Sequence, residues 1–342
     1  MSEQNQTSRL QSIPFSVLDL APIREDGGPA DSFKRTVDLA QHTESLGYNR
    51  YWLAEHHNMP FIASSATSVL IGHVASQTSS IKVGSGGVML PNHAPLVIAE
   101  QFGTLESLFP GRIDLGLGRA PGTDQLTAHA LRRGGQSGPH DFPDQLEELR
   151  SYFDPSRGPA NPHVRAYPGE GLDIPIWLLG SSGYSAQLAG EEGLPFAFAS
   201  HFSPRDTVPA LDLYKRTFKP SGSLAEPHAM VGVNIIAAET DEEAKRLATT
   251  LQQQFLNLIR KNESPLPPPV DSMEDIWTEW EKQALKQQLG SSIIGSKETV
   301  KHQLGSFIEK TGADEVMVIS QIYDHDARRR SYEIVAELFK GE

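Results

Sequence analysis

A carboxylate and two imidazoles follow one another at Glu55, His56 and His57, directly after the apolar, strand-favouring residues 51–54. In α/β proteins, side chains at the carboxyl ends of strands collect where ligands bind. Adjacent strand residues point to opposite sides, so His56 and His57 cannot chelate one metal from regular strand geometry, and the first expected strand supplies no imidazole. We therefore expect no metal site. One histidine acting as acid or base, with the other packed or hydrogen-bonded, is the better interpretation.

Glycines mark the ends of two later strands. Gly86 and Gly87 close the segment 83–87, where a backbone without side chains can lie flat against a planar ligand or simply form a tight turn. Arg119 follows Gly116-Leu117-Gly118. An arginine at that place can bind a phosphate in bidentate fashion or pair with a carboxylate on the barrel rim. Neither glycine segment continues as a P-loop or as a Rossmann helix.

A third segment joins a strand to a helix through small residues. Exposed backbone N–H groups at a helix start bind phosphate, although an ordinary serine cap would use the same residues. The segment consists of Ser181, Ser182, Gly183 and Tyr184. His93 and His201 also lie near strand ends and are further candidates for contact with a ligand.

Composition narrows the class of protein. The 342 residues carry a formal charge of −13 and no cysteine. The charge disfavours a nucleic-acid surface, and the absence of cysteine excludes disulfides and a thiolate nucleophile. The N-terminal residues lack the apolar run of a signal peptide, and no stretch is long enough to cross a membrane. We expect a cytoplasmic enzyme without nucleic-acid or membrane partners.

Strand and helix signals alternate along the chain. Apolar runs predict eight strands, at 15–18, 50–54, 81–85, 113–117, 175–179, 195–199, 231–237 and 315–319, with helices between them. The first helix is expected to be capped by Asp31. This order predicts an α/β protein with a single (β/α)8 TIM barrel over residues 1–342. Two rim insertions are expected, a lid-like loop at 119–141 and a Pro-rich insertion near 250–294.

Taken together and in this order, the segments 54–57, 83–91 and 111–119 resemble the bacterial luciferase-like family of flavin-dependent monooxygenases. Residues 295–300 and 312–315 are similar to that family's last βα unit, and the resemblance spans 14–339. It implies FMN bound at the carboxyl end of the barrel and delivered in reduced form by a separate flavin reductase. It also implies a homodimer formed through the helices after the second and third strands.

The resemblance assigns roles to individual residues. His56 matches the family's catalytic histidine beside the flavin ring, and Glu55 before it matches a flavin contact. Gly86 and Gly87 match a non-prolyl cis peptide under the ring. The flavin phosphate is matched by Arg119 and by the loop Ser181, Ser182, Gly183 and Tyr184.

The resemblance has limits, because luciferases proper carry a cysteine where this chain has Gly118, and the loop 120–140 differs as well. Light emission and an aldehyde substrate are therefore not expected. The expected function is that of a two-component monooxygenase, which uses reduced FMN and O2 to oxygenate a small organic substrate that the sequence does not identify. The alternatives are a deazaflavin-dependent oxidoreductase on the same barrel and a non-catalytic flavin-binding protein.

Overall fold

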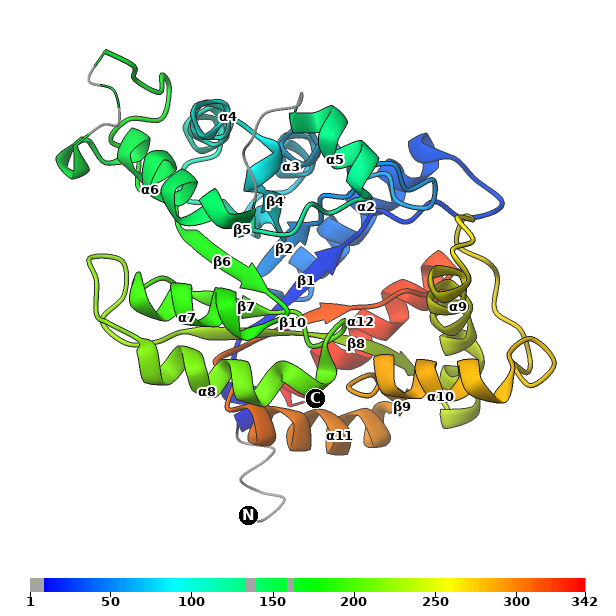
Figure 1. The fold of residues 1–342 in the computed structure, drawn as a ribbon. Coiled ribbons are helices and arrows are strands. Elements are labelled where there is room, and N and C mark those ends of the chain that lie inside the picture. Colours follow the sequence, from blue (N-terminus) through cyan, green and yellow to red (C-terminus); the bar gives the residue numbers. More distant parts are fainter. Residues whose placement is uncertain (1–8, 133–138, 159–160, 162, 342) are drawn as a thin grey trace.

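A closed barrel of eight parallel strands forms the centre of the computed structural model, which describes all residues except 1–8, 133–138, 159–160, 162 and 342 (Figure 1). Helices pack around the barrel, and the last strand pairs with both the first and the seventh, so the predicted single (β/α)8 barrel is confirmed. The barrel strands are β1 (Phe15–Asp19), β2 (Arg50–Leu53), β3 (Lys82–Ser85), β5 (Ile113–Gly118), β6 (Ile176–Gly180), β7 (Phe196–Phe198), β8 (Ala229–Ala238) and β10 (Glu315–Ile319).

Two short strands lie outside the predicted eight. The strand β4 (Val88–Met89) pairs with β5, and β9 (Ile293–Ser296) pairs with the far end of β8. The latter pairing exists because β8 continues past the closed part of the barrel, and it extends the sheet there. Leu90–Asn92 form the short 3-10 helix η1 directly after β4.

The helices are α2 (Pro29–Ser45), α3 (Thr67–Gln77), α4 (Pro95–Leu108), α5 (Gln125–Arg132), α6 (Phe142–Phe153), α7 (Gly183–Glu191), α8 (Thr207–Thr217), α9 (Asp241–Arg260), α10 (Glu279–Gln288), α11 (Lys297–Thr311) and α12 (His325–Lys340). The expectation that Asp31 caps the first helix is wrong. The helix begins at Pro29 with Gly28 as its cap, because proline fits a first helical position, and the Asp31 carboxylate accepts the Gly28 N–H at 3.3 Å. Part of the expected loop 119–141 is the helix α5, and the Pro-rich residues lie between α9 and α10.

Side chains fill the barrel interior in layers, as expected of a packed core rather than a pore. At the amino ends of the strands, Arg50 donates to Asp114 at 2.8 Å and to Glu315 at 3.0 Å. Above this charged layer, the rings of Trp52 and Trp177 pack edge to face with centroids 5.3 Å apart. The barrel mouth is the end of the barrel at which the carboxyl ends of the strands lie. Its floor is formed by the next apolar side chains, among them Leu18, Leu20, Leu179 and Ile319. Among the described residues, no helix combines the length and the apolar character needed to cross a bilayer.

Candidate active site

The Glu55 carboxylate holds two histidines at the barrel mouth. Its Oε1 accepts hydrogen bonds from His57 Nε2 at 3.0 Å and His93 Nε2 at 2.8 Å, and its Oε2 accepts the Met89 N–H at 3.3 Å. Burial alone would raise the pKa of Glu55, but the hydrogen bonds from the two histidines outweigh it and hold the pKa below its usual range. Among the described residues this is the one group with ligand atoms close enough for a metal ion. The hydrogen bonds account for the positions of all three side chains.

The His56 ring makes a separate contact, with the segment that follows β5. Its Nδ1 lies 3.2 Å from the Gly122 carbonyl oxygen. Burial lowers the pKa of His56, and the contact with Gly122 offsets this only in part, so the ring is neutral at pH 7. A carbonyl oxygen can only accept, so Nδ1 carries the proton and Nε2 is left as an acceptor. This arrangement is that of a general base.

Gly86 and Gly87 form part of the floor. The peptide bond between them is cis, as the family resemblance implies. A Cβ on Gly86 would lie 2.7 Å from Leu18 Cδ1, and one on Gly87 would lie 2.8 Å from the Gly116 carbonyl oxygen. Gly87 therefore needs glycine because the backbone of β5 approaches closely, whereas a side chain at Gly86 would have to displace the end of Leu18.

Arg119 and the start of α7 lie together on the adjacent part of the rim. The Arg119 guanidinium lies over the Tyr184 ring, with its carbon 3.9 Å from the ring centroid, and no carboxylate of the described residues pairs with it. Ser182 caps α7 without a side-chain hydrogen bond, so the first N–H groups of the helix lack a cap. A free cation beside an open helix start fits a phosphate. The rim-carboxylate alternative for Arg119 is not found in the described part of the chain.

His201 follows β7, on the opposite side of the barrel from β2. Its N–H donates to the Gly232 carbonyl oxygen at 2.8 Å, and its ring lies where a side chain at Gly232 would be. Burial lowers the pKa of His201 to about 4, with a smaller contribution from His56. A second neutral imidazole therefore faces the mouth. In the sequence, only its position near the end of a strand indicated that His201 could contact a ligand.

The segment after β5 supplies residues that the sequence did not indicate. Gly122 provides the carbonyl oxygen for His56, and Thr123 Oγ1 donates to the His57 carbonyl oxygen at 2.8 Å. Neither residue type carries a functional signal by itself. The contacts join positions 66 residues apart, a separation that no local pattern can indicate.

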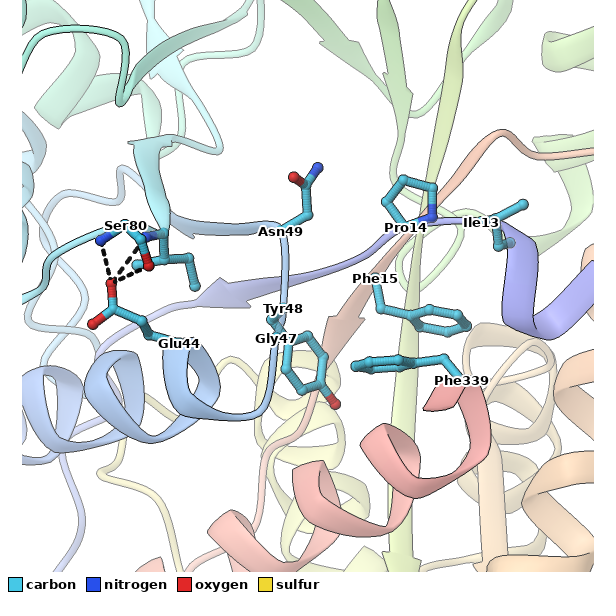
Figure 2. A pocket seen from close by; sticks show the side chains of 10 residues that line it. Ile13, Pro14, Phe15, Glu44, Gly47, Tyr48, Asn49, Ser80 and Phe339 are labelled. Atoms are coloured by element: carbon cyan, nitrogen blue, oxygen red, sulfur yellow. Dashed lines mark hydrogen bonds between the residues drawn. The ribbon is translucent and has the colours of Figure 1, made fainter. Parts of the chain in front are cut away.

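A cavity of about 430 Å³ lies at the opposite end of the barrel (Figure 2). Its lining comes from residues at or before the amino ends of β1, β2 and β3, and Figure 2 shows the ring of Phe15 stacked on that of Phe339. The Glu44 carboxylate accepts the N–H groups of Ser79, Ser80 and Ile81 at 2.5–2.9 Å, which ties α2 to the start of β3. These contacts are structural, and active sites of such barrels lie at the other end.

The model of a family described as luciferase-like monooxygenase matches residues 13–315 of the chain. The chain belongs to this family. The luciferase-like monooxygenase of Escherichia coli (strain K12) is 54% identical over 96% of this chain and 97% of the relative. The N-acetyl-S-alkylcysteine monooxygenase of Bacillus subtilis (strain 168) is 34% identical over 95% and 98% of the two chains. The protein is therefore an enzyme of a monooxygenase family.

Solved structures share the fold of this luciferase-like chain. Apo-MsnO8 has a TM-score of 0.85 and 36% identity, covering 96% of this chain and 98% of its own. The FMN complex of the oxygenating constituent of 3,6-diketocamphane monooxygenase from Pseudomonas putida has a TM-score of 0.72 and 18% identity over 97% and 98%. An F420-dependent secondary alcohol dehydrogenase has a TM-score of 0.65 and 12% identity over 96% and 99%. The barrel is thus one that holds flavin-type cofactors in proteins of known structure.

Proposed function

We propose that this protein is the oxygenating component of a two-component monooxygenase, which takes reduced FMN from a separate flavin reductase and uses O2 to oxygenate a small organic substrate. The observation that carries the proposal is the free Arg119 guanidinium beside the uncapped start of α7, on the same barrel mouth as His56. FMN carries a phosphate that matches this site, and its ring system needs the flat, apolar floor that the mouth offers.

Each part of the cofactor has residues to hold it. The phosphate would be bound by Arg119 and by the backbone N–H groups at Ser182 and Gly183, with Ser181 beside them and the Tyr184 ring holding the guanidinium in place. The flavin ring would lie over the Gly86–Gly87 peptide, next to His56. Since the Glu55 carboxylate is engaged with His57, His93 and Met89, any contact of Glu55 with the flavin would be made through its backbone.

Bound reduced FMN would supply the activation of O2, which no side chain provides. The protein itself would transfer protons and exclude water from the flavin ring. His56 would accept or return a proton at Nε2, because burial keeps the ring neutral and Nδ1 is engaged with Gly122. Leu18, Leu179 and the side-chain-free glycines would keep water away from the ring from below.

The test begins with anaerobic titration of the protein with reduced FMN and, in parallel, with reduced F420. Binding of FMN, followed by 18O2 label in a thioether such as N-acetyl-S-methylcysteine or in a ketone, supports the proposal. The thioether is chosen because of the named activity of the Bacillus relative. Binding of F420 but not FMN would replace oxygenation by hydride transfer on the same barrel, and binding of neither would refute a flavin function.

His56 is tested separately from cofactor binding. Replacing His56 with Ala should leave FMN affinity unchanged and lower oxygenation by about 100-fold or more, the usual contribution of a general base. His302→Ala, at an exposed histidine of α11, is the matched control and should retain full activity. Unchanged turnover in the His56 variant would refute its role.

We further propose a homodimer that forms through α3 and α4. These neighbouring helices expose the aliphatic side chains of Val69, Val97 and Leu108, which are 72%, 44% and 63% exposed (Figure 1). Exposed aliphatic groups on adjacent helices are the kind of surface that protein–protein interfaces cover. The reductase is proposed because the diketocamphane enzyme is the oxygenating constituent of its system.

A further inference from the structure

The carbonyl oxygen of Gly122 is the hydrogen-bond partner of His56 Nδ1, at 3.2 Å. The same oxygen accepts the His57 N–H at 3.4 Å. It belongs to the segment between β5 and α5 and not to a barrel strand. The state of the His56 ring therefore depends on where this segment lies.

Two further contacts hold the segment against the loop that follows β2. Thr123 Oγ1 donates to the His57 carbonyl oxygen at 2.8 Å, and Asn58 Nδ2 donates to Asp124 Oδ2 at 3.0 Å. Gly122 has a φ of +63°, and a Cβ there would lie 2.9 Å from the Glu55 carbonyl oxygen. Only glycine brings the carbonyl this close to His56 without strain.

We propose that Gly122 and Thr123 are positioning residues that fix His56 in the tautomer protonated at Nδ1, so that Nε2 is the nitrogen that accepts a proton in the reaction. The consequence for catalysis rests on the proposed function, whereas the tautomer is a property of the protein alone. Hydrogen-bond partners of one imidazole nitrogen set the protonation of the other. His56 is thus a base at Nε2 only while the segment that leads into α5 is docked.

The segment is also anchored on its far side. Asn92 Nδ2 donates to the Pro121 carbonyl oxygen at 2.8 Å, and Arg132 Nε donates to Asn92 Oδ1 at 3.1 Å. The contacts of Pro121 and Thr123 hold Gly122 from both sides. A carbonyl fixed in this way selects a tautomer, because it does not rotate toward solvent when the ring turns.

The tautomer is measured directly by 15N NMR of histidine side chains in protein labelled at histidine, with His56→Gln used to assign the His56 signals. We expect the Nδ1-protonated form in the native protein. Thr123→Val, which keeps the side-chain shape but loses the hydroxyl, and Gly122→Ala should each raise the population of the Nε2-protonated form. Thr217→Val is the matched control, because its hydroxyl donates to the Leu213 carbonyl oxygen at 2.9 Å within its own helix α8, and it should leave the tautomer unchanged.

Kinetics give the second readout. Loss of a typical hydrogen bond should lower kcat by about three- to tenfold in Thr123→Val while KM for reduced FMN stays the same. The acid limb of the kcat profile should move to lower pH, since the contact with Gly122 raises the pKa of His56. The titratable groups that act on His56 are Glu55, His57 and, across the mouth, His201, and none of them is altered.

The outcomes separate the two proposals. Finding the Nε2-protonated form in the native protein would overturn the positioning role, whatever the activity. Finding the native tautomer unchanged in both Thr123→Val and Gly122→Ala would overturn it as well. The expected tautomers together with a normal kcat in Thr123→Val would confirm that the segment fixes the ring and would refute the role of Nε2 in turnover. Failure of FMN to bind would refute the proposed function and leave the tautomer result standing.

Discussion

Replacing Arg119 with Gln should separate recognition of the FMN phosphate from recognition of the flavin ring. The guanidinium has no carboxylate partner among the described residues, so its removal leaves no buried anion behind, and the effect is confined to what Arg119 binds. A hydrogen bond to a charged group contributes about 1.5–3 kcal/mol. Affinity for FMN should therefore fall by about 10- to 100-fold, while affinity for riboflavin, which lacks the phosphate, should stay within about twofold.

The assay is fluorescence titration of both flavins against both proteins. Tyr184 offers a graded second step, because its ring lies 3.9 Å from the Arg119 guanidinium carbon and its side chain is 38% exposed. Loss of a cation–π contact of about 0.5–1 kcal/mol predicts a two- to fivefold weakening of FMN binding in Tyr184→Leu. Tyr184→Phe keeps the ring and should bind FMN normally. Equal losses for FMN and riboflavin in Arg119→Gln would refute the phosphate site.

Three further predictions concern stability and assembly. Glu55→Gln keeps the side-chain volume but removes the negative charge to which both His57 and His93 donate. The free energy of unfolding in urea at pH 7 should therefore fall by about 1–3 kcal/mol. An unchanged free energy would contradict a stabilising role of these two hydrogen bonds. The pKa of His201 is lowered to about 4 in the folded protein, so as the pH falls this histidine is protonated in the unfolded chain before it is protonated in the folded one. The free energy of unfolding should therefore decrease between pH 6.5 and 4, by up to about 3 kcal/mol. His201→Gln should lack this component of the pH dependence. The double variant with Val69→Glu and Leu108→Glu should be a monomer in analytical ultracentrifugation, whereas Leu258→Glu, on α9, should remain a dimer. A dimer in both variants would exclude α3 and α4 as the interface.

The barrel was predictable because its strands are apolar runs with clear ends, and burial on both faces requires such runs in a parallel sheet. The elements that escaped prediction depend on contacts distant in sequence. The helix α5 is short, and Arg132 at its end is held by Asn92, 40 residues away in the sequence. The strand β4 has two residues and exists only through its pairing with β5. No local pattern shows either of these contacts.

The residues proposed to bind the phosphate were indicated by the sequence for a different reason. Arg119 and the segment 181–184 each follow a strand directly, and strand ends in a barrel meet at one mouth. The sequence left open whether Arg119 pairs with a carboxylate, because a partner can come from any rim loop. The hydrogen bond between His93 and Glu55 could not be predicted either, because the two residues lie 38 positions apart in the sequence.

The three residues that follow β2, Glu55, His56 and His57, make different contacts. The Glu55 carboxylate accepts hydrogen bonds from His57 and from the Met89 N–H of β4, whereas His56 Nδ1 lies against the Gly122 carbonyl oxygen of the segment after β5. Glu55 and His57 thus form an acid–histidine pair on either side of His56, the proposed base. Since the His57 N–H also bonds to the Gly122 carbonyl oxygen, the pair holds the atom that orients His56. A change at Glu55 should therefore reach the reaction through the position of Gly122, with a lower kcat and an altered His56 tautomer, rather than through weaker binding of the flavin.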